Sequence, residues 1–340
     1  MKLIIPSANR YNKLARTLEY YDELGLINTR LDIHILDGSN SENASRYIKL
    51  CEKYKITYLA WNNLGLNERL LKASSEIVKS DELFFIGNDE DVFTPGYIDS
   101  SIEFMTNNIE YSTYIGKYFT LARPILGINR VPFERLTIST YHLDADEPRV
   151  RMNMLSKLLL VGISPLFYGI RRGSQFHLSC KVFNDIEYGG AGEFADQILL
   201  SFSGKIYCHS QIMLVRDETK IKHIKAHTHQ RTDSYITKQD LSELNTAIKN
   251  HININQDIIE EFSTNWIPID ENKNTIALTK FRKYYSPYES GKYKNSLNTI
   301  YRIFITLFEI INYFQLKRQL TEVGLATRTI NKLLKKTEAK

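Results

Sequence analysis

Leu83-Phe84-Phe85-Ile86-Gly87-Asn88-Asp89-Glu90-Asp91 joins a short apolar run to a dense group of carboxylates. The apolar run is too short for a helix and too hydrophobic for a surface strand, so it predicts a buried strand. No lysine or arginine lies within five residues of the three acidic positions on either side. Adjacent carboxylates repel one another, and hard divalent ions take oxygen ligands. The stretch therefore indicates either a metal site or a solvated turn before Pro95.

Strands and helices are predicted to alternate before this stretch. Short strands are expected at residues 3–5, 31–36 and 56–59, and helices at about 13–24, 42–54 and 66–79. Short connections between them predict a parallel sheet that helices cover on both faces. Sites in such sheets lie beyond the carboxyl ends of the strands. The residues that follow the predicted strands are polar, which favours a site there: Ser7, Asp37, Asn62 and Asp89 to Asp91.

Three motifs at these strand ends resemble the family-2-type nucleotide-sugar glycosyltransferases of the GT-A fold. They are Ile-Ile-Pro-Ser-x-Asn-Arg at 4–10, Leu-Asp-Gly-Ser at 36–39 and Asn-Asp-Glu-Asp at 88–91. The resemblance covers about the first hundred residues, and Leu36 stands where family members often have a second aspartate. It implies an α/β fold of the GT-A (Rossmann-like) type, with a mostly parallel central sheet and helices on both faces.

The same resemblance implies a donor site and a metal site. Asp37 would hold the nucleoside base and Asp89 the ribose, while Asp91 and Asp89 would ligate Mn2+ or Mg2+ on the diphosphate. The full set of implied donor-binding residues is Pro6, Ser7, Asn9, Arg10, Asp37, Asn62, Asp89 and Glu90.

The segment 188–200 contains the predicted catalytic base. Three glycines in four residues allow the backbone to approach a ligand closely, and a helix is expected behind them. Asp196 resembles the second residue of the family's Glu-Asp motif, which is the general base of inverting members, although Ala195 replaces the glutamate. Glu193 is the second choice, and the preference of helix N-termini for carboxylates is its alternative explanation.

Three of the eight histidines lie within seven residues, at His223, His227 and His229. Histidines two apart share one side of a strand, and histidines four apart share one face of a helix. In some enzymes of the GT-A fold a C-terminal histidine completes the metal shell. This resemblance makes His227 and His229 predicted metal ligands, with a hydrogen-bonding polar loop as the alternative.

Further predictions concern the rest of the chain and its division into domains. Closing strands are predicted at 205–207 and 211–215, and residues 129–154 are predicted to be irregular, as an acceptor loop or a surface insertion. We expect a GT-A catalytic domain over 1–225, with a nucleotide-binding half (1–110) and an acceptor half (111–225). A C-terminal extension would follow over 226–291, and a basic amphipathic helical tail over 292–340.

The tail carries the basic character of the chain. Ten lysines and arginines stand against three acidic residues over 292–340, so the remainder is close to neutral and a nucleic-acid partner is not expected. Apolar residues over 297–316 share one broad face of a helix, with basic clusters after them. Residues 297–336 therefore fit a helix on an anionic inner membrane surface, a helix packed on the protein itself, or a homodimer contact.

Other bulk features narrow the class of protein. The three cysteines are scattered without a CxxC pair, which suits a reducing cytoplasm and argues against a disulfide scaffold or a thiolate zinc site. The N-terminus does not resemble a signal peptide, and no apolar stretch of about 18 residues predicts a membrane span. A cytoplasmic location is expected, at the inner face of the membrane where the tail binds it.

The function that these features predict is transfer of a sugar from a nucleotide-diphosphate donor to a glycan or lipid-linked acceptor. The reaction would be metal-dependent and inverting, and the resemblance favours a role in bacterial surface-glycan (polysaccharide) biosynthesis. One alternative is a sugar nucleotidyltransferase, but such enzymes usually have a glycine-rich first loop, and residues 7–12 contain no glycine. The other is a non-catalytic membrane-binding or partner-binding protein that retains the fold.

Overall fold

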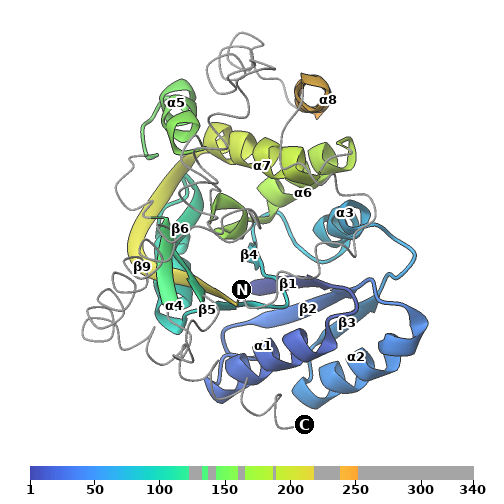
Figure 1. The fold of residues 1–340 in the computed structure, drawn as a ribbon. Coiled ribbons are helices and arrows are strands. Elements are labelled where there is room, and N and C mark those ends of the chain that lie inside the picture. The colour runs from blue at the N-terminus through green and yellow to red at the C-terminus, as the bar shows by residue number, and fades with distance from the viewer. Residues whose placement is uncertain (122–131, 137–142, 160–164, 187–188, 218–237, 252–340) are drawn as a thin grey trace, which may run out of the picture.

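The computed structural model describes residues 1–121, 132–136, 143–159, 165–186, 189–217 and 238–251 (Figure 1). The strands are β1 (Lys2–Ser7), β2 (Asp32–Asp37), β3 (Thr57–Ala60), β4 (Leu83–Ile86), β5 (Asp91–Phe93), β6 (Tyr111–Leu121), β7 (Pro132–Leu136), β8 (Ile170–Arg172) and β9 (Lys205–Asp217). The helices are α1 (Tyr11–Glu23), α2 (Ser41–Tyr54), α3 (Leu66–Glu76), α4 (Pro95–Asn107), α5 (Pro148–Leu159), the 3-10 helix η2 (Pro165–Tyr168), α6 (Gly173–Asn184), α7 (Gly189–Ser203) and α8 (Lys238–His251).

All strands of the described residues belong to one nine-stranded sheet, in the order β3-β2-β1-β4-β8-β6-β9-β5, with β7 paired to β6. The pairs within β1 to β4 are parallel, and so is the pair β6–β9. The strands β5, β7 and β8 run in the opposite direction. The prediction of a mostly parallel α/β sheet is therefore confirmed.

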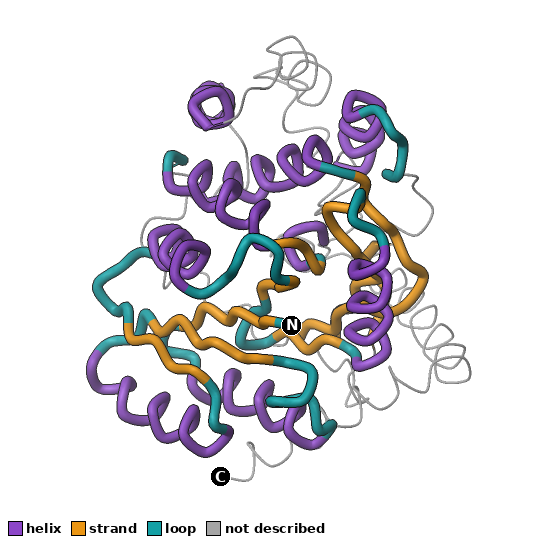
Figure 2. Tube along the Cα trace, turned by 180° about the vertical axis from the view of Figure 1, so that it is seen from behind, coloured by secondary structure: helices purple, strands orange, loops and turns teal. Residues whose placement is uncertain are grey.

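Helices cover both faces of this sheet, as the two views show (Figures 1 and 2). Leu3 and Ile5 point into the core shared with α1, α2 and α4, whereas Ile4 points into the core shared with α3 and α6. Both faces of a strand are therefore buried, which explains why the predicted strands are continuously apolar. On the second face, Phe84 stacks on Phe176 of α6 with ring centroids 4.3 Å apart.

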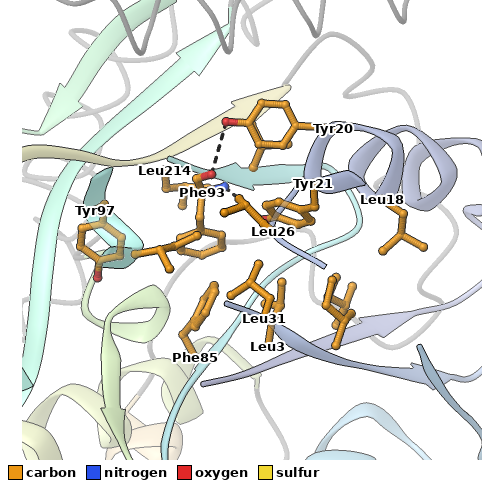
Figure 3. Close-up of a cluster of buried hydrophobic side chains, with 14 of the residues drawn as sticks. Leu3, Leu18, Tyr20, Tyr21, Leu26, Leu31, Phe85, Phe93, Tyr97 and Leu214 are labelled. Carbon is orange, nitrogen blue, oxygen red and sulfur yellow. Dashed lines mark hydrogen bonds between the residues drawn. The ribbon is translucent and has the colours of Figure 1, made fainter. Parts of the chain in front are cut away.

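The first core holds the strand that follows the acidic stretch in place (Figure 3). The backbone N–H of Phe93 on β5 donates to the hydroxyl of Tyr21 at 3.1 Å, and the hydroxyl of Tyr20 donates to the carbonyl of Phe93 at 3.4 Å. Two neighbouring tyrosines of α1 thus bind both backbone groups of one β5 residue. They fix β5, and with it the residues between β4 and β5, against α1.

Three local predictions were wrong. The two expected closing strands form the single strand β9, and the segment expected to be irregular contains β7 and the first part of α5. α5 begins at Pro148, a residue that the first turn of a helix tolerates because its missing N–H would have no intrahelical partner. α7 begins at Gly189, so the glycines expected in a loop lie in its first turn.

The predicted domain boundaries remain predictions. One sheet runs through both expected halves of the catalytic domain, and α8, from the expected extension, packs on α6 and α7. The tail 292–340, with its proposed contact segment 297–336, lies outside the described residues. None of the helices in the described ranges combines the length and apolar character that crossing a membrane requires.

Candidate functional site

The carboxyl ends of β1, β2 and β4 bring together three predicted site residues. The parallel register pairs Ser7 with Asp37 at the ends of β1 and β2. The chain after β4 then passes the end of β1, and the hydroxyl of Ser7 donates to Oδ2 of Asp89 at 2.9 Å. Because the three strands are adjacent and parallel, side chains from distant parts of the sequence meet at one edge of the sheet.

Asp89 is held from three sides and is only 3% exposed. Arg10 Nη1 lies 3.3 Å from Oδ1, Ser7 binds Oδ2, and the hydroxyl of Thr17 on α1 donates to the backbone carbonyl at 2.9 Å. Burial raises the pKa of Asp89 to about 6, although Arg10 and Ser7 act in the opposite direction. The carboxyl group therefore titrates close to neutral pH.

Two cations from α1 and the turn before it neutralise the acidic stretch. Lys13 forms an ion pair with Glu90, and Arg10 Nη1 lies 3.8 Å from Oε1 of Glu90. Lys13 precedes Glu90 by 77 residues, so the sequence around the acidic stretch contains no sign of this partner. The protein therefore supplies cations of its own to this stretch, which neither alternative from the sequence, a metal site or a solvated turn, had included.

The acidic stretch nevertheless has the oxygen chemistry of a Mn2+ or Mg2+ site. Asp91 is the first residue of β5, two positions after Asp89, and it is fully buried. Divalent ions at nucleotide sites are commonly held by one or two carboxylates together with substrate phosphates. Groups of three or more potential metal ligands do not occur within the described ranges. Donor phosphates and water would complete the shell of an ion held by one or two carboxylates. His227 and His229 lie outside the described residues.

Asp37 lies in a second polar cluster at the end of β2 and is 1% exposed. The backbone N–H of Ser39 donates to its Oδ1, and the hydroxyl of Tyr58 on β3 donates to its Oδ2, both at 2.8 Å. Burial and the neighbouring carboxylate raise the pKa of Tyr58, so its hydroxyl keeps the proton that it donates. Tyr58 was not predicted, because nothing in the strand pattern distinguishes it from a packing residue.

A buried arginine from α3 caps the two strand ends. Arg69 Nη1 donates to the carbonyl of Leu36 at 2.8 Å and to that of Ser7 at 3.2 Å. A Cβ atom on Gly38 would lie 2.5 Å from Cζ of Arg69. The glycine of the Asp-Gly-Ser motif therefore leaves room for this guanidinium, a requirement that the sequence did not reveal.

The remaining predicted donor residues lie in or next to the same strand ends. Pro6 lies in β1 opposite Leu36, and Asn62 lies in the exposed turn after β3. Asn9 is exposed and adopts a left-handed backbone conformation with φ 57°, which is uncommon outside glycine. Their positions agree with the strand-end site, but no contact in the described structure assigns them a ligand.

Asp196, the predicted base, lies within α7 and forms an ion pair with Arg171 of β8. Both side chains are completely buried. Burial raises the pKa of Asp196, against the lowering effects of Arg171 and Ser179. Glu193 lies one turn earlier in α7, and its side chain is outside those described.

The chain has the GT-A fold of nucleotide-sugar glycosyltransferases. S. aureus TarS (residues 1–349) matches it with a TM-score of 0.52 and 10% identity over 85% of this chain and 75% of TarS. The same protein in complex with UDP-GlcNAc matches with a TM-score of 0.50 and 11% identity over 83% and 80% of the two chains. The mannosyltransferase PcManGT from Pyrobaculum calidifontis, in complex with GDP-Man and Mn2+, has a TM-score of 0.44 and 11% identity over 98% and 86%.

No family model matches the sequence, and no curated protein matches it either. At these identities the likeness establishes the fold alone. Fold does not determine function, which has to be argued from the site itself.

Proposed function

We propose that this protein is a glycosyltransferase that uses a nucleoside diphosphate sugar as donor. One observation carries the proposal: Ser7, Arg10, Asp37 and Asp89 gather at the carboxyl ends of adjacent parallel strands in a chain with the GT-A fold. The likeness to a protein solved with UDP-GlcNAc supports a donor of this class.

The two polar clusters around Asp37 and Asp89 suggest a division of roles. Asp37 accepts two hydrogen bonds from the protein, and an ionised carboxylate has about four lone-pair sites, so it can still accept an N–H of the base. Asp89 would bind the ribose, and Arg10 would attract the diphosphate. Lys13 would add positive charge close to the same phosphates, with Glu90 holding its ammonium group.

The proposal includes Mn2+ or Mg2+ held by Asp91 and Asp89. When bound, such an ion would act as a Lewis acid toward the departing nucleoside diphosphate. The arrangement of Asp89 supports this assignment, since its carboxyl group is oriented by Ser7 and its backbone by Thr17.

For the acceptor side we propose an inverting displacement, with Asp196 as the base and Glu193 as the second choice. Because Asp196 is fully buried against Arg171, an acceptor hydroxyl could reach it only after neighbouring segments move. The proposal also predicts a glycan or lipid-linked acceptor and a role in polysaccharide biosynthesis. It further predicts that residues 297–336 contact a membrane or a second copy of the chain.

A donor panel tests the proposed function. The purified protein would be incubated with UDP-, GDP- and dTDP-sugars in Mn2+ or Mg2+, and release of nucleoside diphosphate and the melting temperature would be measured. We expect one donor class to stabilise the protein and to be hydrolysed slowly. Preference for nucleoside triphosphates would favour a nucleotidyltransferase, and no response to any nucleotide would favour a non-catalytic protein.

A further inference from the structure

Tyr47 of α2 is a fully buried residue whose hydroxyl reaches the strand-end site. Its oxygen accepts a hydrogen bond from the backbone N–H of Arg10 at 2.8 Å and lies 3.1 Å from Oγ of Ser7. One hydroxyl group therefore joins the end of β1 to the turn that leads into α1.

The turn between β1 and α1 depends on these outside contacts. The backbone N–H of Asn9 donates to Oγ of Ser39 at 2.8 Å, and that of Arg10 donates to Tyr47. Asn9 has a positive φ of 57°, a conformation that persists only where the surroundings hold it. The side chains of Ser39, which follows β2, and of Tyr47 in α2 thus hold the chain that presents Arg10.

The contacts continue from Tyr47 to the acidic stretch. Ser7 lies within hydrogen-bond distance of Tyr47 on one side and donates to Asp89 on the other, at 2.9 Å. Its hydroxyl has one proton, so donation to Asp89 leaves Ser7 to accept from Tyr47. A fixed Tyr47 hydroxyl therefore sets the direction in which Ser7 donates.

We propose that Tyr47 is a positioning residue of the donor site, which orients Asp89 through Ser7 and Arg10 through its backbone N–H. The inference rests on the proposed function, because Asp89 and Arg10 are assigned there to the ribose and the diphosphate. Tyr47 itself is fully buried and is assigned no contact with the donor, so it would act through these two residues. Its aromatic ring packs against Tyr11 with centroids 5.9 Å apart, so the ring and the hydroxyl have separable roles.

Tyr47→Phe removes the hydroxyl and keeps the ring. We expect roughly tenfold weaker binding of UDP or GDP in Mn2+, measured by calorimetry well below the melting temperature, because buried groups lose their partners. Tyr54→Phe is the matched control, since Tyr54 is also a buried tyrosine of α2 but its hydroxyl contacts Lys53. That variant should bind nucleotide as the wild type does.

A second readout separates positioning from general stability. In a Ser7→Ala background the hydroxyl that connects Tyr47 to Asp89 is already absent. Tyr47→Phe should therefore weaken nucleotide binding less than it does in the wild type. Equal effects in both backgrounds, or binding by Tyr47→Phe within about twofold of Tyr54→Phe, would overturn the inference. Should Tyr47→Phe fail to fold, Ser39→Ala removes the other side-chain contact that holds the turn before Arg10, the bond from the Asn9 N–H. Unchanged nucleotide binding in that variant would again count against the inference.

Nucleotide binding by the wild-type protein separates a failure of the proposed function from a failure of the positioning role. Failure of the wild-type protein to bind either nucleotide would overturn the proposed function, and the inference with it. Wild-type binding together with an unaffected Tyr47→Phe variant would overturn the positioning role alone.

Discussion

Arg171 on β8 and Asp196 on α7 form an ion pair in which both side chains are completely buried. Breaking a buried pair by removing one partner is strongly destabilising, because the remaining charge is left without compensation. Asp196 therefore contributes to the structure whatever it does in catalysis. Substitutions at this position have to be designed so that the two contributions can be told apart.

The Asp196→Ala variant should lose about 3–5 kcal/mol of unfolding free energy, since Arg171 would keep a buried, unpaired charge. Asp196→Asn also removes the charge that balances Arg171, but it preserves the shape and a hydrogen-bond acceptor, so it is the better test of catalysis. If Asp196 is the base, this variant should bind donor normally and transfer sugar roughly 100-fold more slowly or worse. Chemical denaturation, donor binding and transfer assays give the three readouts.

Normal transfer by Asp196→Asn would show that the base assignment is wrong. Glu193→Gln is the companion variant on the same helix. A large loss of transfer in Glu193→Gln alone would move the base to that position.

Gly38→Ala should destabilise the protein by about 1–3 kcal/mol and weaken nucleotide binding, because its Cβ would overlap the Arg69 guanidinium. Thermal unfolding and nucleotide calorimetry measure the two effects. In an Arg69→Ala background the overlap is gone, and Gly38→Ala should then cost little more. Additive losses in the double variant would contradict this explanation of the glycine.

Tyr58→Phe should weaken UDP or GDP binding by roughly tenfold, since Asp37 would lose a charge-assisted hydrogen bond. The effect should be confined to the nucleoside part of the ligand. Binding of inorganic pyrophosphate, measured in the same way, should stay unchanged. An equal loss for pyrophosphate would mean that Tyr58 supports the site as a whole and does not act through Asp37.

Removal of divalent metal should reduce wild-type affinity for a nucleoside diphosphate, and Asp91→Asn should abolish that dependence. The reason is that two carboxylates and the donor phosphates would share the ion. Calorimetric titrations with Mn2+ and with EDTA compare the two proteins. Wild-type affinity that is the same in both buffers would argue against a metal at this site.

The stability of the ligand-free, metal-free protein should depend on pH through Asp89. Its pKa is higher in the folded chain, at about 6, than the ordinary value of 3.8, so the folded state binds this proton more tightly. The associated stability is present below about pH 4 and is lost as the pH rises through 6. Relative to Asp89→Asn, the wild type should lose on the order of 2–3 kcal/mol between pH 4 and 7.5.

Urea unfolding at several pH values measures this difference. Asp99→Asn provides the control, because Asp99 is an aspartate with a 56% exposed side chain on the surface of α4. A stability difference between wild type and Asp89→Asn that does not change with pH, or that changes in the opposite direction, would refute the prediction.

The sequence alone determined the parallel half of the sheet, and it placed the candidate site at the ends of those strands. Apolar runs and helical spacing are local signals. They predicted β1 to β4 and their helices, because the apolar side chains that each element buries recur at a spacing visible within its own residues. The motifs at the strand ends then indicated Ser7, Asp37 and Asp89, since parallel strands bring their carboxyl ends to one edge.

Only the tertiary structure decided which partners those residues have. Lys13 reaches Glu90 across 77 residues, and Tyr47, Tyr58 and Arg69 enter the site from three different elements. In the sequence each of them looks like an ordinary residue of a helix or a strand. Their roles arise from contacts between segments far apart in the chain, and a local pattern carries no information about such contacts.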